Sequence, residues 1–226
     1  MKGIHKNAEP PIFTEWKGKA NANWQPKYDD LRKPEKPAVR LALLQEQGYL
    51  CAYCCCSIED STSIVIEHFI PQSEDENQAL NYENLFACCD GTKIETHTNL
   101  KICCCDESKQ DQFKDENGIM LIKPTHKDDK GFICEQAFSY TNIGAINAKD
   151  TPYKEQAMFT LELLQLDNKE LRRQREAACA FLFDGDAVFD FTPQEVNILK
   201  NNYSILTNNR FQPFANAILY FLTAYF

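Results

Sequence analysis

The sequence lacks any hydrophobic run long enough to cross a membrane. Its longest apolar stretch, Ala217–Phe226, is about half of the roughly 20 residues that a membrane-spanning helix needs. No apolar run follows the first lysine of the opening MKGIHKNAEP, so no secretory signal is expected. We therefore expect a cytoplasmic protein that does not contact a membrane.

The chain also lacks an excess of positive charge. It has 24 Lys and Arg against 33 Asp and Glu, a net charge of −9. The charge is uneven, because residues 1–40 carry nine basic and five acidic side chains, whereas residues 41–226 carry 15 and 28. Phosphate neutralisation supplies most non-specific affinity for nucleic acid, so we expect the isolated chain to bind DNA only weakly.

Internal repeats and low-complexity tracts are absent as well. With 226 residues, of which 43% are hydrophobic, the chain can bury a core and suits one medium domain or two small ones. We expect an N-terminal arm (1–38), a cysteine-rich core (39–130) and a region of short strands followed by helices (131–226).

Local patterns predict an α+β fold. Helices are expected over 13–19, 37–47, 106–113, 153–166, 171–183 and 210–225, and another helix should follow the capping box at 192–195. A hairpin is expected at 49–54, and strands are expected over 64–66, 119–122 and 131–140.

Cysteine is the abundant residue. The chain has 11, and nine of them lie between Cys51 and Cys105. A cytosolic protein keeps its thiols reduced, so clustered cysteines indicate a metal site before disulfides. Cys51 and Cys54 form half of a zinc knuckle, because two intervening residues let both thiolates reach one tetrahedral ion. The other half must come from Cys88 or Cys89 and from Cys103–Cys105.

A carboxylate and an imidazole follow the predicted strand at 64–66. Glu67 and His68 end this strand, and successive strand residues point to opposite faces. Such a pair can divide two tasks, with the carboxylate holding a divalent cation and the neutral imidazole taking a proton from water. An ordinary surface dipeptide is the alternative interpretation.

The order of these residues resembles the HNH endonucleases, which have a ββα-metal fold. The resemblance covers about residues 47–113 and is carried by the run Cys51-x-x-Cys54, Glu67-His68-x-x-Pro71, Asn84, Cys88 and Cys105-Asp106-x-x-Lys109. Two departures are the aspartate at 106, where the family has Asn or His, and the long insertion before Cys105.

The resemblance implies a role for each of these residues. His68 would be the general base, Glu67 and Asp106 would hold a catalytic Mg²⁺ or similar ion, and Asn84 would fix the loop and orient His68. Lys109 could contact phosphate, and Cys51, Cys54, Cys88 and Cys105 would bind a structural zinc. The reaction implied is hydrolysis of phosphodiester bonds, leaving 5′-phosphate and 3′-hydroxyl ends.

Outside the core, the opening residues and the run 163–172 are similar to the PtuB-type HNH effectors of Septu and some retron anti-phage systems. This similarity implies a PtuA-like ATPase partner and a nucleic-acid substrate, with DNA favoured. Two alternatives stay open: a ribonuclease, for example one that acts on tRNA, and a non-catalytic zinc-binding interaction module.

Four further features admit two interpretations each. Trp16, Trp24 and Tyr28 could stack on nucleic acid, although packing on the body is favoured slightly. The basic run Lys169–Arg175 could touch a polyanion or be solvated, and the aromatic residues after 210 could form core or interface. His97, in the insertion, could be a ligand or a bystander.

Overall fold

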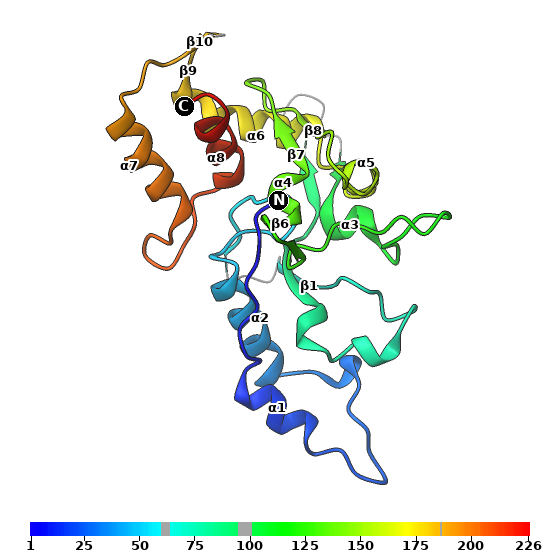
Figure 1. Cartoon of the computed structure of the whole chain (residues 1–226). Helices are drawn as coiled ribbons and strands as arrows, with labels where there is room; N and C mark the ends of the chain where they lie inside the picture. The colour runs from blue at the N-terminus through cyan, green and yellow to red at the C-terminus, as the bar shows by residue number, and fades with distance from the viewer. Residues whose placement is uncertain (60–63, 95–100, 186) are drawn as a thin grey trace.

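The computed structural model describes residues 1–59, 64–94, 101–185 and 187–226. It is an α+β structure of helices and small antiparallel sheets, as predicted (Figure 1). Its helices are α1 (Pro11–Lys17), α2 (Glu35–Glu46), α3 (Cys105–Lys109), α4 (Ile133–Gln136), α5 (Lys154–Leu163), α6 (Lys169–Cys179), α7 (Pro193–Ser204) and α8 (Ala215–Ala224).

The strands are short. They pair as β1 (Ile64–His68) with β2 (Leu85–Cys89), β3 (Thr92–Ile94) with β4 (Lys101–Cys103), β5 (Lys127–Asp128) with β6 (Gly131–Phe132), β7 (Phe138–Tyr140) with β8 (Ile146–Ala148), and β9 (Phe183–Asp184) with β10 (Ala187–Val188).

The β1–β2 hairpin is the centre of the part that carries the predicted site. Its register places Ile64 opposite Cys89 at one end and His68 opposite Leu85 at the other. The side chain of Gln47, just after α2, is buried against the middle of β2, where it donates to the carbonyl of Ala87 (2.8 Å) and accepts from its N–H (2.8 Å). This amide pairs the free edge of β2, and so ties α2 to the hairpin.

The helix α3 follows the β3–β4 pair and packs on β2. The backbone N–H of Cys104 donates to Gly91 (2.7 Å), and that of Cys105 donates to Leu164 (3.0 Å). Gly91 has φ of 68°, and a Cβ there would lie 2.3 Å from the Cys104 carbonyl oxygen, so this close approach requires glycine. The predicted helix over 106–113 ends early, because Gln110 has φ of 51°.

The N-terminal segment packs on the same core as the hairpin. Phe13, Trp16 and Leu31 are buried in it, and the rings of Trp16 and Trp24 meet edge to face. The Lys6 ammonium donates to the carbonyl of Leu85 (2.9 Å) at the end of β2. The packed interpretation of Trp16 and Trp24 is therefore the one that the structure supports.

The C-terminal half differs from the sequence predictions in several places, and the helix predicted over 171–183 is α6, which ends at Cys179. Residues 119–122 make one isolated bridge, between Met120 and Lys114, and not a strand. Within 131–140, α4 separates β6 from β7, and the side-chain amide of Gln136 at the end of α4 donates to the carbonyls of Gly131 and Phe132.

The last helix also begins later than predicted. The N–H groups of Phe211 and Phe214 bond the carbonyls of Gly48 (2.9 Å) and Cys55 (3.0 Å), and these tertiary bonds keep the segment out of the helix. In contrast, the predicted capping box is confirmed: Thr192 and Glu195 exchange hydrogen bonds at the start of α7.

Candidate metal centre and active site

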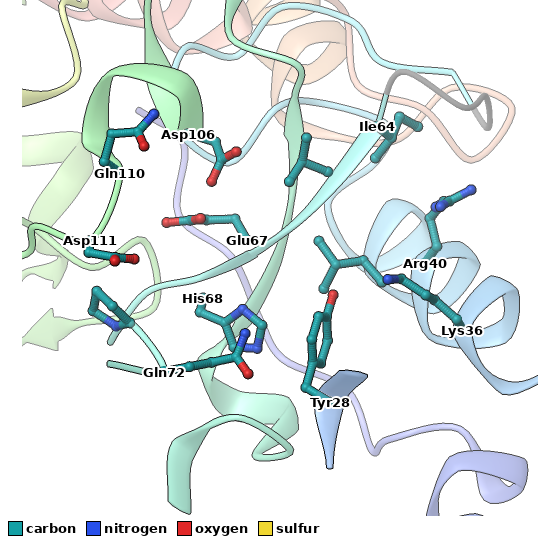
Figure 2. A pocket seen from close by; sticks show the side chains of 13 residues that line it. Tyr28, Lys36, Arg40, Ile64, Glu67, His68, Gln72, Asp106, Gln110 and Asp111 are labelled. Atoms are coloured by element: carbon teal, nitrogen blue, oxygen red, sulfur yellow. The ribbon is translucent and has the colours of Figure 1, made fainter. Parts of the chain in front are cut away.

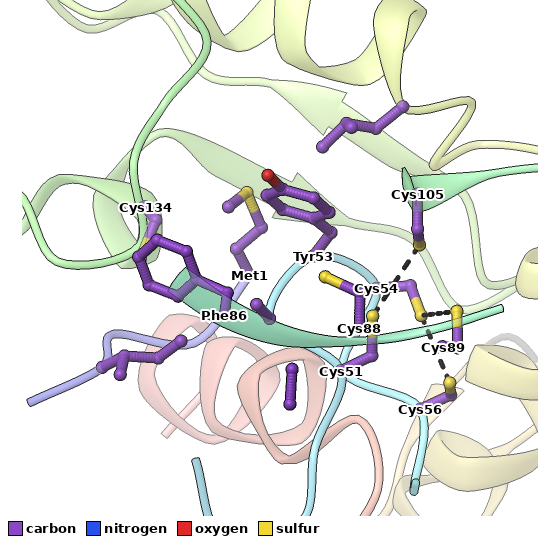
Figure 3. Packing of buried hydrophobic residues seen from close by; sticks show 14 of the residues in the cluster. Met1, Cys51, Tyr53, Cys54, Cys56, Phe86, Cys88, Cys89, Cys105 and Cys134 are labelled. Carbon is purple, nitrogen blue, oxygen red and sulfur yellow. Dashed lines mark hydrogen bonds between the residues drawn. The ribbon is translucent and has the colours of Figure 1, made fainter. Parts of the chain in front are cut away.

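Four cysteine sulfurs gather at one end of the hairpin. The Sγ atoms of Cys51, Cys54, Cys89 and Cys105 all lie within 4.8 Å of one another, and all four residues are buried (Figure 3). The distances from Cys51 to Cys105 and from Cys54 to Cys89 are both 3.9 Å. A zinc ion with sulfurs at about 2.3 Å sets them about 3.8 Å apart, so this cysteine cluster fits a tetrahedral zinc site.

A tight turn presents the first two sulfurs. The N–H of Cys55 donates to the carbonyl of Cys51 (3.1 Å), and the N–H of Cys51 donates to Cys56 (2.9 Å). Cys55 takes φ of 63° to close this turn. The N–H of Ala52 then donates to the Ala87 carbonyl (3.1 Å), which docks the turn against β2.

The second pair differs from the one expected from sequence. Cys88 was expected as a ligand, but Cys89 is the residue of β2 that lies with the other three sulfurs. Adjacent residues of a strand point to opposite faces, so only one of the two can join the cluster. Burial raises the pKa of Cys88, whereas hydrogen bonds from Cys104 and Cys105 hold the pKa of Cys89 low. The choice of Cys89 rests on the position of its sulfur beside the other three.

All 11 cysteines are free thiols in this structure. Besides the four in the cluster, Cys56 lies beside Cys54, with 3.3 Å between their sulfurs. A disulfide needs about 2.05 Å, so these contacts are not bridges. Cys103 is half-buried on β4, and His97 lies outside the described residues.

An open pocket of about 490 Å³ lies along β1 and reaches the other end of the hairpin (Figure 2). We call it the polar pocket, because carboxylates, amides, an imidazole and two cations line most of it. The polar lining residues are Tyr28, Lys36, Arg40, Glu67, His68, Gln72, Asp106, Gln110 and Asp111.

Glu67 and Asp106 form the acidic part of this pocket. Glu67 is 4% exposed, accepts from the Tyr53 hydroxyl (3.0 Å), and lies 2.8 Å from the Lys109 ammonium. Burial raises the pKa of Glu67, and the neighbouring Asp106 raises it further while Lys109 opposes both. Two carboxylates side by side repel each other, and their oxygens are the donors that a hard divalent cation prefers.

His68 is held in one orientation. Its Nε2 lies 3.1 Å from the carbonyl oxygen of Ala79, and its ring meets the ring of Tyr28 edge to face at 4.4 Å. Because a carbonyl oxygen can only accept, Nε2 carries the proton and Nδ1 keeps its lone pair. Burial lowers the pKa of His68, so the imidazole is neutral near pH 7. The side chain is thus set up to accept a proton.

Asn84 fixes the loop that follows β1. Its side chain accepts from the N–H of Ile70 (2.8 Å) and donates to the carbonyls of Ile70 (2.9 Å) and Gln78 (3.1 Å). Gln78 precedes Ala79, the residue whose carbonyl holds His68. Asn84 therefore acts on His68 through the loop, and no direct bond between the two is present.

Lys109 does not lie where a phosphate could reach it. It is 1% exposed, and besides Glu67 it donates to the backbone carbonyl of His68 (3.0 Å). Its ammonium joins α3 to β1. The sequence expectation of a phosphate contact is therefore wrong, and Lys109 holds the acidic part of the pocket together.

The basic run Lys169–Arg175 is largely occupied within the chain. Arg172 pairs with Asp167, Arg173 pairs with Glu170, and Arg175 is buried with its Nε donating to Gly144 (2.7 Å). Of the C-terminal aromatics, Phe214 and Phe221 are core, whereas Tyr225 and Phe226 are exposed.

Sequence reasoning missed six residues of the site: Tyr53, Lys36, Arg40, Gln72, Gln110 and Asp111. Tyr53 lies inside the Cys51-x-x-Cys54 knuckle, and its aromatic ring could have suggested a role beyond zinc. Lys36 precedes the helix predicted over 37–47, whereas α2 begins at Glu35 and places Lys36 and Arg40 on one face. Tyr28 was noted for stacking, but its contact with His68 comes from tertiary packing.

Comparisons with known proteins add a similarity in sequence. No protein-family model matches the chain. Among curated proteins, it is similar to the Septu protein PtuB of Bacillus thuringiensis, with 31% identity over 98 residues, which is 42% of this chain. The match spans 34% of that relative's length. No helix among the described residues combines the length and the hydrophobicity needed to span a membrane.

Proposed function

We propose that this chain is a metal-dependent HNH endonuclease that hydrolyses phosphodiester bonds of nucleic acid, with DNA the favoured substrate. The observation that carries the proposal is the polar pocket, in which an oriented, neutral His68 lies with the paired carboxylates Glu67 and Asp106. The order of the elements also supports it, since an antiparallel hairpin is followed by a helix that supplies Asp106, as in a ββα-metal motif.

In the proposed reaction, His68 Nδ1 takes the proton of a water molecule. The water oxygen bonds to phosphorus while the bond to the 3′ oxygen breaks, and the leaving oxygen takes a proton from solvent. The ends are a 5′-phosphate and a 3′-hydroxyl. Glu67 and Asp106 are the residues that would hold a divalent cation such as Mg²⁺, which supplies charge stabilisation at the phosphate. Asn84 and Ala79 keep the imidazole oriented.

The cysteine cluster has a separate task in this proposal. A zinc ion on Cys51, Cys54, Cys89 and Cys105 would be fully coordinated by sulfur, which is typical of structural sites and leaves no open position for a reactant. Cys105 begins α3 and Asp106 is the next residue, so zinc would fix the start of the helix that supplies a carboxylate.

The similarity to the Septu protein PtuB supports a role in anti-phage defence. We propose that the chain is the effector of such a system and works with an ATPase partner of the PtuA kind. The net charge of −9 agrees with a nuclease that relies on a partner for much of its grip on the substrate.

The test is a cleavage assay on duplex DNA, single-stranded DNA and tRNA, with Mg²⁺ or Mn²⁺, with and without the ATPase. His68→Ala should lower the cleavage rate by about 10²- to 10⁴-fold and keep its zinc. His126→Ala, which removes an exposed imidazole outside the pocket, is the matched control and should cleave normally. If wild-type protein with its partner cuts none of the three substrates, the proposal is wrong; the substrate that is cut decides between DNA and RNA.

A further inference from the structure

Two cations lie in the polar pocket away from its carboxylates. Lys36 and Arg40 are separated by one turn of α2 and therefore share one face of that helix. In Figure 2 they stand on α2 on the far side of the pocket from Asp106, with Tyr28 nearby. Lys36 Nζ lies 4.9 Å from the centre of the Tyr28 ring.

Neither cation is neutralised. Within residues 1–59, 64–94, 101–185 and 187–226, no carboxylate forms an ion pair with Lys36 or Arg40, whereas Lys109, Arg172 and Arg210 each have one. Arg40 Nε is buried and has no hydrogen-bond partner among the described residues. An arginine N–H that is removed from water without a partner costs free energy, which a bound acceptor would recover.

The surroundings of the pair favour an anion. Burial lowers the pKa of Lys36, and the neighbouring charges of Arg32 and Arg40 lower it further, while Asp29 opposes them. A ligand with negative oxygens would relieve this repulsion and bond the free Arg40 N–H. Arginine suits phosphate because its planar group donates two parallel hydrogen bonds, while lysine adds a point charge.

We propose that Lys36 and Arg40 bind a backbone phosphate of the nucleic-acid strand next to the scissile one. This inference rests on the proposed function and deepens it, by naming the side chains that set where the strand lies. The carboxylates Glu67, Asp106 and Asp111 repel phosphate in the absence of a divalent cation, so the cations on α2 give the strand its direction across the pocket. They are positioning residues, because they touch a phosphate that does not react.

The test measures binding separately from cleavage. Full-length His68→Ala protein, which should not cut, is titrated with fluorescent single-stranded DNA, duplex DNA and tRNA over a series of salt concentrations. Lys36→Gln with Arg40→Gln should weaken binding about tenfold or more. The slope of log K against log salt should become shallower by about 0.7 to 0.9, the loss of one phosphate contact.

The matched control removes two positive charges elsewhere. Lys19→Gln with Lys130→Gln changes the net charge equally, and both residues are exposed and outside the pocket. It should bind nearly as tightly as the parent. In the cleaving background, the Lys36 and Arg40 double variant should raise KM and leave kcat unchanged, while Arg40→Lys should recover part of the affinity. Zinc content and melting temperature of each variant report whether it is folded.

The outcomes separate this inference from the proposed function. If the pocket variant binds as tightly as the control variant, or if the parent binds none of the probes even at low salt, the phosphate site is wrong, whether or not the wild type is a nuclease. If binding depends on the pair but the wild type cuts nothing, the phosphate site stands and the nuclease proposal fails.

Discussion

The two ends of the β1–β2 hairpin differ in the chemistry of the side chains that they bring together. At the Cys89 end, four buried sulfurs face one another without a charged side chain among them. At the His68 end, carboxylates, an imidazole and cations line an open pocket. The two ends are four residues apart along β1, about 13 Å at the usual rise of a strand. Side chains suited to a soft cation and side chains suited to a hard cation therefore lie on one small hairpin without mixing.

The short helix α3 belongs to both ends. Cys105 contributes a sulfur to the cluster, Asp106 lines the pocket, and Lys109 bonds Glu67 and the His68 carbonyl. A five-residue helix has little stability alone, so its position depends on these anchors. The cysteine end therefore anchors the start of α3, whereas the polar end holds buried charges that are paired with each other.

The largest expected effect comes from a change within the cysteine end. Cys89→Ser should lose zinc and lower the free energy of unfolding by several kcal/mol, because structural zinc contributes about 10 kcal/mol or more to folding. Cys88→Ser is the matched neighbour and should cost only about 1–2 kcal/mol, the penalty for a buried hydroxyl, with zinc retained. Metal analysis and thermal unfolding of both variants test the prediction. Zinc loss in Cys88→Ser, with zinc kept in Cys89→Ser, would reverse the assignment of β2.

A second change acts at the polar end. Lys109→Met leaves Glu67 buried without its cation, and we expect a loss of about 3–5 kcal/mol in the free energy of unfolding. Zinc content should stay at the wild-type level, which separates this loss from damage to the cysteine cluster. Chemical denaturation measures the stability.

The matched control for this change is the double variant Lys109→Met with Glu67→Gln. It should be more stable than Lys109→Met alone, because no uncompensated charge stays buried. If the double variant is no better than the single one, the stability comes from packing of the lysine chain and not from the ion pair.

The two ends of the hairpin could be predicted from the sequence to different degrees. The Cys51-x-x-Cys54 knuckle and Glu67-His68 could be found by spacing alone, since each is a local pattern. The strand β2 was not predicted, because Leu85–Cys89 is an apolar run without alternation between polar turns. The choice of Cys89 over Cys88 depends on which face of β2 meets the knuckle, and long-range packing decides that.

The role of Lys109 and the partners of the pocket depend on tertiary structure in the same way. A lysine one turn into a helix is normally solvated, and only the docking of α3 on the β1–β2 hairpin buries it. Lys36 and Arg40 are ordinary helix-surface residues until α2 is placed beside β1. Local chemistry could thus be predicted, whereas the pairing of charges could not.

The smallest expected loss of stability comes from a change that acts on His68 through the loop after β1. Asn84→Ala removes three hydrogen bonds from the loop after β1, and should cost about 1–3 kcal/mol while zinc is retained. Because this loop carries Ala79, whose carbonyl orients His68, the proposed nuclease activity should fall by about 10- to 100-fold even where the variant is fully folded. Asn77→Ala, at an exposed position of the same loop, is the control and should leave activity unchanged. Equal activity in the two variants, measured at a temperature where both are folded, would mean that His68 holds its orientation without Asn84.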